Sequence, residues 1–117
     1  MKTIRINRKM WACNPLSWPS KLYDNRTNRG CCLGHVIHQT SKCSWKELND
    51  LREPNDFFVK CNNDLVTTDT DGVYNSKLST DAMEINDSCK FTTSEKEYKL
   101  KNLFAEHGIN LEFYGEL

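Results

Sequence analysis

Alternating apolar and polar residues mark short strands near both ends of the chain. Residues 3–7 and 110–114 alternate in this way and include β-branched or aromatic residues, which is typical of strands with one buried face. Two apolar stretches, 57–61 and 65–68, are predicted to be further strands that meet at a hairpin turn through the Asn-Asn pair at 62–63. We therefore expect short antiparallel strands.

Helical spacing and capping signals predict helices in the first half of the chain. Residues 31–40 place their apolar side chains close to one helical face and tolerate a glycine, Gly34, on the packed side. Ser44 and Glu47 form a capping box, in which each side chain bonds to the other residue's backbone N–H. This box begins a short helix over residues 45–51, which ends before a proline.

Two further helices are predicted in the last third of the chain. Ser79 or Thr80 is expected to cap a helix that runs to about Asn86. A second capping box at residues 94–97 begins the other helix, which Gly108 ends at its C′ position. These signals bring the expected total to three to four helices.

The elements mix without a regular βα order, so the sequence predicts an α+β fold. We expect a small single domain that binds a ligand and spans residues 1–117. Hydrophobic residues make up 38% of the chain and charged residues 27%, as in globular domains. No apolar run approaches the ~20 residues that span a bilayer, and the start lacks the apolar core of a secretory signal. The expected location is the cytoplasm, away from membranes.

The charge is balanced overall but uneven along the chain. Residues 1–60 carry 11 basic and 5 acidic side chains, a net of +6, and residues 61–117 carry 5 and 11, a net of −6. This polarity favours head-to-tail self-assembly or a basic lobe around an anionic ligand, and an ordinary surface of mixed charge is the alternative. A net charge of zero argues against general binding to DNA.

Six cysteines are the most prominent compositional feature. We expect free thiols, because no export signal is present and the adjacent Cys31 and Cys32 would need different partners. These two lie near His35 and His38, but adjacent cysteines on a helix point about 100° apart and form a poor zinc chelate. No phosphate-binding loop and no catalytic motif is present, so we expect neither a metal, a cofactor nor an enzyme.

Ligand binding has more support. A loop-rich segment combines basic side chains, suited to phosphates, with aromatic rings, suited to stacking on a base. Its members are Arg8, Lys9, Trp11, Trp18, Tyr23, Arg26 and Arg29. Ordinary surface arginines beside half-buried aromatic rings are the alternative. The helix N-terminus at residues 92–94 adds backbone donors suited to an anion.

Four short motifs occur in order along nearly the whole chain. They are Arg8-x-x-Trp11-x-Cys13, Cys31-Cys-Leu-Gly34, Ile85-Asn-Asp87 and Leu103-Phe-Ala-Glu-His-Gly-Ile109, followed by a closing strand. Together they resemble the small phage-encoded Thoeris anti-defence proteins of the first type.

The resemblance implies a molecular sponge. Members of that family capture cyclic ADP-ribose isomers released by the TIR enzymes of an infected bacterium, and they hold these signals without cleaving them. They form homo-oligomers, described as hexamers, with nucleotide pockets shared between protomers. Some are also described as holding cyclic oligonucleotides at separate pockets.

Several residues are expected to contact such a ligand. We expect Trp11 or Tyr74 to stack on adenine, and Asn86 and Asp87 to bind its polar edge or the ribose hydroxyls. Helix termination is the alternative role for the Asn86-Asp87 pair. Because Asn86 is predicted at a helix end, we expect Asn86→Ala to weaken binding while leaving the fold intact.

The pyrophosphate is expected to meet Arg26 or Arg29, which are chosen on chemistry alone. Lys96 and Lys99 are further candidates on the last helix, where the family more often has arginine. A lysine offers a point charge and no fork, so the chain departs from the family there. The alternative function is a phage protein that inhibits a host protein by binding it directly through exposed aromatic residues.

Overall fold

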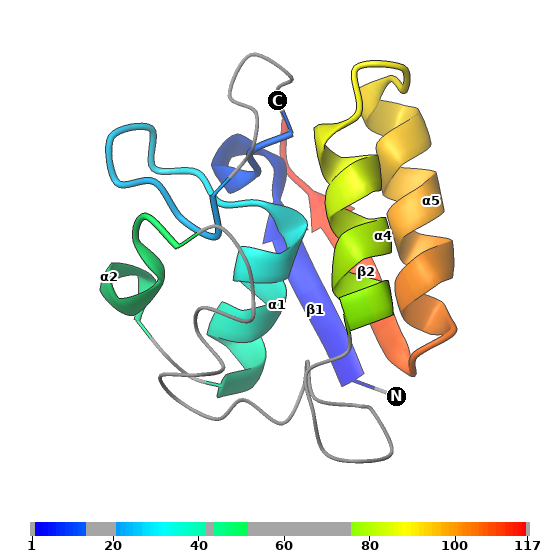
Figure 1. Ribbon diagram of the computed structural model, residues 1–117, viewed down its shortest axis with the longest axis horizontal. Coiled ribbons are helices and arrows are strands. Elements are labelled where there is room, and N and C mark those ends of the chain that lie inside the picture. Colours follow the sequence, from blue (N-terminus) through cyan, green and yellow to red (C-terminus); the bar gives the residue numbers. More distant parts are fainter. Residues whose placement is uncertain (1, 14–20, 42–43, 52–75, 117) are drawn as a thin grey trace.

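The computed structural model describes residues 2–13, 21–41, 44–51 and 76–116 (Figure 1). The predicted hairpin over 57–68 and the candidate residue Tyr74 lie outside these ranges. In chain order the elements are β1 (Lys2–Asn7), the 3-10 helix η1 (Arg8–Met10), α1 (Cys32–Ser41), α2 (Trp45–Leu48), α4 (Ser76–Asp87), α5 (Thr93–Ala105) and β2 (Ile109–Tyr114). The expected α+β fold with three to four helices is confirmed for the described part of the chain.

The two predicted terminal strands form and pair with each other, but they run parallel. Ile4 lies opposite Leu111, and Ile6 lies opposite Phe113. The expectation of antiparallel strands is therefore wrong for this pair. A parallel pair needs a long crossover connection, and here the helices between the first and last strands supply it.

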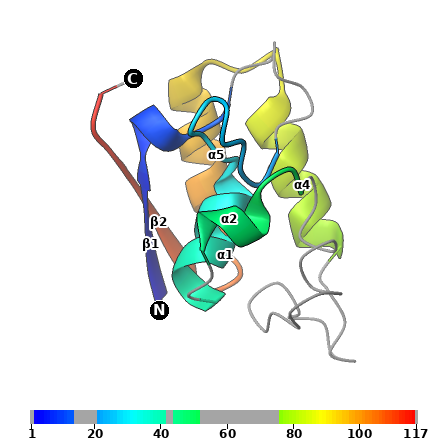
Figure 2. The same cartoon turned by 90° about the vertical axis from the view of Figure 1, so that its left-hand side faces the viewer.

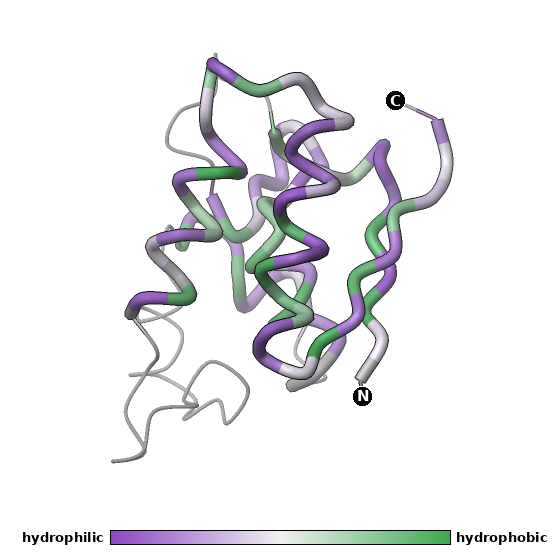
Figure 3. Tube along the Cα trace, turned by 90° about the vertical axis from the view of Figure 1, so that its right-hand side faces the viewer, coloured by the Kyte–Doolittle hydropathy of each residue, from purple (hydrophilic) through white to green (hydrophobic). Residues whose placement is uncertain are grey.

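The helices cover one face of this small sheet (Figures 1 and 2). Helix α1 packs on β1, and α5 packs on β2. Along both strands hydrophobic and hydrophilic residues alternate (Figure 3). The inward residues Ile4, Ile6 and Leu111 are buried, whereas Arg5 and Glu112 form an exposed ion pair of 3.1 Å on the other face. The fold thus has two layers, the sheet and the helices that cover it. The sheet itself has one apolar and one polar face.

Helix boundaries show where local signals suffice and where they do not. The capping box of Ser44 and Glu47 is confirmed, although α2 already ends at Leu48. Helix α5 begins two residues earlier than predicted, because Thr92 and Glu95 form its capping box. The box predicted at residues 94–97 is wrong.

The start of α4 and the end of α5 also differ from the predictions. Helix α4 begins at Ser76, so Ser79 and Thr80 lie inside it and do not cap it. Helix α5 ends at Ala105, and Gly108, with φ of 78°, stands at the turn into β2.

Close packing fixes α1 against the segment before it. Gly34 and Gly30 both face the backbone of Leu22, and a Cβ added at Gly34 would lie 1.8 Å from the Leu22 carbonyl oxygen. Leu22, Leu33 and Ile37 are fully buried there.

No helix in the described ranges is long and apolar enough to cross a membrane.

Candidate functional site

Asn86, at the end of α4, is the centre of a buried hydrogen-bond network. Its Oδ1 accepts from Trp11 Nε1 at 2.7 Å and from the backbone N–H of Cys32, at the start of α1, at 3.1 Å. Its Nδ2 donates to the carbonyl of Ala12 at 2.8 Å and to Asp87 Oδ1 at 2.9 Å. Trp11 and Asn86 are both 0% exposed. One amide therefore ties α4 to α1 and to the segment that follows η1.

Lys96 adds a buried positive charge to this network from the first turns of α5. Its side chain is buried, and Nζ donates to the carbonyls of Cys13 at 2.7 Å and Asn86 at 2.9 Å. The ammonium thus joins the segment after η1 to the end of α4. We call Trp11, Asn86, Asp87 and Lys96 the Asn86 network.

Charged side chains of both signs lie close to Cys13, next to this network. Burial raises the pKa of the Cys13 thiol and the charge of Glu97 adds to this, whereas the charges of Lys96 and Arg29 and a hydrogen bond with Thr93 act in the opposite direction. Arg29 is exposed and has no ion pair with any residue in the described ranges. Arg29 therefore stands beside the network as a cation open to solvent.

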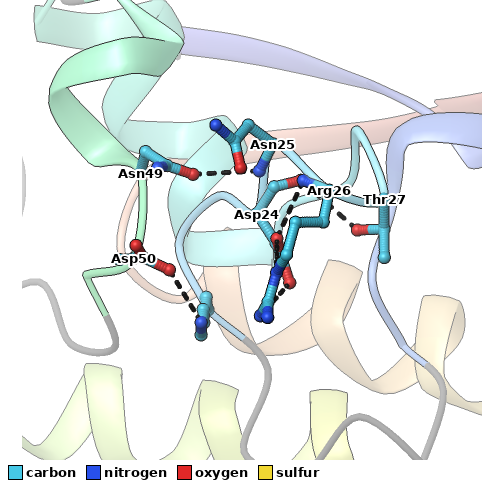
Figure 4. A network of polar contacts seen from close by, with 7 residues as sticks. Asp24, Asn25, Arg26, Thr27, Asn49 and Asp50 are labelled. Atoms are coloured by element: carbon cyan, nitrogen blue, oxygen red, sulfur yellow. Dashed lines mark hydrogen bonds and ion pairs between the residues drawn. The ribbon is translucent and has the colours of Figure 1, made fainter.

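Arg26 is held inside its own loop (Figure 4). Its Nε and Nη2 each lie 3.1 Å from an oxygen of the Asp24 carboxylate, and its backbone N–H donates to the same group. These hydrogen bonds are the main cause that holds the pKa of Asp24 below its ordinary value. Thr27 Oγ1 donates to the Asp24 carbonyl. An anion would have to compete with Asp24 for this guanidinium.

Helices α4 and α5 form an open groove on the outer surface, which we call the α4–α5 groove. It has a volume of about 590 Å³. The lining residues are Glu84, Ile85, Ser88, Phe91, Tyr98, Lys99, Asn102, Leu103 and Glu106. Lys99 Nζ lies 4.6 Å from the centre of the Phe91 ring, a cation–π contact, and the Tyr98 side chain is 69% exposed.

Packing is the role of the two histidines of α1 and of Cys31, which directly precedes this helix. Burial lowers the pKa of His35 to about 4, and its Nε2 lies 2.8 Å from the carbonyl of Met10. His38 stacks on Trp45 at 4.1 Å. Burial raises the pKa of Cys31 to about 12, so its thiol is a poor nucleophile. The described residues contain no group of three or more potential ligands that could hold a metal ion.

The predicted site residues therefore fall into separate places. Trp11, Asn86, Asp87 and Lys96 share the buried Asn86 network, with Arg29 beside it. Lys99 lies in the α4–α5 groove and Arg26 in the loop of Figure 4.

Burial gives the Asn86 network a structural role. Trp11 contacts Phe113 at 4.6 Å between ring centres and has no exposed surface on which a base could stack. The expectation that Asn86→Ala leaves the fold intact is corrected, because the substitution would leave several buried polar groups unpaired.

Comparison with known protein families, with curated proteins and with solved structures finds no match.

Phe91 and Tyr98 are candidates that the sequence alone did not single out. Tyr98 and Asn102 on α5 and Glu106 at its C-cap follow at intervals of four residues, so they share one helical face. The face of Lys96, Leu100 and Phe104 is offset from theirs and is buried. The signal available in the sequence was an aromatic residue, Tyr98, at a helical position off the apolar face.

Proposed function

We propose that this chain is a binding protein without catalytic activity that sequesters cyclic ADP-ribose isomers in the cytoplasm of a phage-infected bacterium. The α4–α5 groove is the observation that carries the proposal. Its volume of about 590 Å³ lies within the range of roughly 300–1,000 Å³ found for small-molecule sites. The motif resemblance to Thoeris anti-defence proteins indicates the class of ligand.

The lining of the groove suits the parts of such a ligand. Phe91 and Tyr98 offer rings on which adenine can stack, and the Asn102 amide can pair with its polar edge. Ser88 and the carboxylates of the groove can bind ribose hydroxyls. The Lys99 ammonium can leave the Phe91 ring to meet a phosphate oxygen. Every group acts by binding, and sequestration needs no more.

The charge of the groove supports a pocket shared between protomers. Its lining includes one ammonium, Lys99, and two carboxylates, Glu84 and Glu106, whereas the pyrophosphate is an anion. Further cations must therefore come from outside the groove, and Arg29 is an exposed arginine suited to that role. A homo-oligomer, a hexamer by the resemblance, would bring Arg29 of one copy to the groove of another.

A ligand-release experiment tests the proposal. The purified protein is incubated with the nucleotide made by a TIR enzyme, washed and heat-denatured, and the released compound is identified by mass spectrometry. We expect the cyclic ADP-ribose isomer to return intact. Altered nucleotide would indicate an enzyme, and a protein that retains none would refute the proposal. A cyclic dinucleotide in the same assay tests whether the protein also binds cyclic oligonucleotides, the second class of ligand that the resemblance implies.

Two exposed tyrosines provide a matched pair of variants. Tyr98→Ala should weaken binding by about fivefold or more, because one base–aromatic stack contributes about 1–3 kcal/mol. Tyr114→Ala removes a tyrosine that is also exposed, at 51%, but lies on β2 outside the groove, and should leave the affinity unchanged. Equal effects of both variants would place the ligand elsewhere.

Direct inhibition of a host protein is the second candidate. It is favoured by the exposure of Tyr98 and Tyr114, since tyrosines often dominate binding energy at protein interfaces. This function predicts that no nucleotide is retained in the release experiment, and that both tyrosine variants keep a normal fold but lose inhibition.

A further inference from the structure

The outer edge of β1 is closed by a side chain. Gln39, on α1, accepts from the backbone N–H of Arg5 at 3.0 Å and donates its amide to the Arg5 carbonyl at 2.5 Å. In a strand, the N–H and C=O of one residue point to the same side, and those of its neighbours point to the other. The backbone N–H and C=O of Arg5 therefore point away from β2, and those of Ile4 and Ile6 point toward it.

The same rule identifies the backbone groups at the open edge of β2. Ile4 lies opposite Leu111, so in a parallel ladder it bonds to Asn110 and Glu112. The backbone groups of Ile109, Leu111 and Phe113 consequently point away from β1. Within the described ranges, no backbone outside β1 bonds to β2, and no side chain closes this edge as Gln39 closes the other.

We infer that this edge pairs with the β2 strand of a second copy of the chain, antiparallel and about a two-fold axis centred on Leu111. Among the described residues the sheet has two strands, which is marginal by itself, and an open edge is a ready template for another strand. Pairing in this register joins Leu111 to the partner's Leu111 and Ile109 to the partner's Phe113 by backbone hydrogen bonds. The result is one continuous sheet with β1 at each outer edge.

The open face of β2 is complementary to itself in this register. On the helix-covered face Leu111 and Ile109 are already buried, at 1% and 3% exposure, so backbone hydrogen bonds join the two strands there. On the open face, Asn110 lies opposite the partner's Glu112, and an amide can donate to a carboxylate there. A register centred on Glu112 would instead place two carboxylates opposite each other, which is unfavourable. This match favours a second copy over an unrelated strand.

Charge substitutions on the open face test the register. Sedimentation velocity should show that the wild type associates and that Asn110→Glu weakens its self-association by about tenfold or more, because each symmetric contact becomes a carboxylate pair. The double variant Asn110→Glu with Glu112→Gln should restore association. Thr3→Glu is the matched control, since it adds the same charge on the same face opposite Asn110, but on β1, and should associate as the wild type does.

Amide hydrogen exchange supplies a second readout, which needs no ligand and stands apart from the proposed function. Protection of the Leu111 and Phe113 amides should rise with protein concentration, whereas that of Glu112, bonded to β1, should not. A mass of 13.6 kDa at every concentration would overturn the inference. Equal effects of Asn110→Glu and Thr3→Glu would also overturn it.

Discussion

Trp11 Nε1 and Asn86 Oδ1 are joined by a hydrogen bond of 2.7 Å, although the two residues are separated by 75 positions in the sequence. Both side chains are completely buried. Inside a protein a polar group is costly when unpaired, so a network of this kind stabilises one arrangement only when all its members are present. The contact fixes the end of α4 against the segment that follows η1.

Asn86→Ala should therefore lower the free energy of unfolding by about 3 kcal/mol, because it strands the Trp11 ring N–H, the Cys32 N–H and the Ala12 carbonyl in the interior. Urea denaturation followed by circular dichroism measures the change. Asn102→Ala removes an exposed asparagine of α5 and should change stability by no more than about 0.5 kcal/mol. Equal stabilities of the two variants would show that the Asn86 network does not hold the fold.

Lys96 should contribute to stability in the same way. Lys96→Met keeps most of the side-chain volume but removes the donors to the Cys13 and Asn86 carbonyls, which should cost about 2 kcal/mol. Lys101→Met is the control, because that lysine is exposed on the same helix. If Lys96 served only to bind a ligand, Lys96→Met would have the same unfolding curve as the wild type.

Much of the local structure could be predicted from the sequence. The alternation in both terminal strands and the Ser44–Glu47 box are patterns that depend on nearby residues alone. The parallel pairing could not be predicted in this way, because it depends on the path of the helices between the strands. Two overlapping capping boxes, Thr92–Glu95 and Ser94–Glu97, both fit the rule for a helix start, and the sequence alone does not choose between them.

The candidate site was predicted less well for a similar reason. The sequence points to Asn86 by its chemistry and to Lys96 by the family resemblance, but such residues are usually exposed, and their burial follows from tertiary packing. Glu84 and Ile85 lie in the same groove as Tyr98 and Lys99 only because α4 and α5 pack together. Single residues could therefore be selected from the sequence, whereas their grouping could not.

Gly34 should tolerate no larger residue. A Cβ there would lie 1.8 Å from the Leu22 carbonyl oxygen, which is backbone and cannot rotate away. We expect Gly34→Ala to lower the unfolding free energy by about 3 kcal/mol or more, since α1 must move off the segment before it. Gly108→Asn is the comparison. Its position has a positive φ of 78° but open space around the Cβ, and asparagine adopts that conformation, so thermal denaturation should show a smaller loss.

His35 should make stability depend on pH in a definite direction. Burial is the main cause that lowers its pKa from 6.5 to about 4, although the Met10 carbonyl, which accepts from Nε2, acts against the shift. The unfolded chain therefore binds this proton more readily than the folded chain. The stability that neutral His35 provides is fully present above pH 6.5 and is lost as the pH falls toward 4, by about 3 kcal/mol in all.

His35→Gln isolates this effect, because glutamine keeps an amide donor near the Met10 carbonyl and does not titrate. The variant should be less stable than the wild type at pH 7, since it loses the ring contact with Trp45. Between pH 6.5 and 4, however, its unfolding free energy should fall by clearly less than that of the wild type, so the two curves should converge. Urea denaturation at several pH values measures both. Parallel curves over this range would show that His35 takes up its proton equally in the folded and unfolded chains.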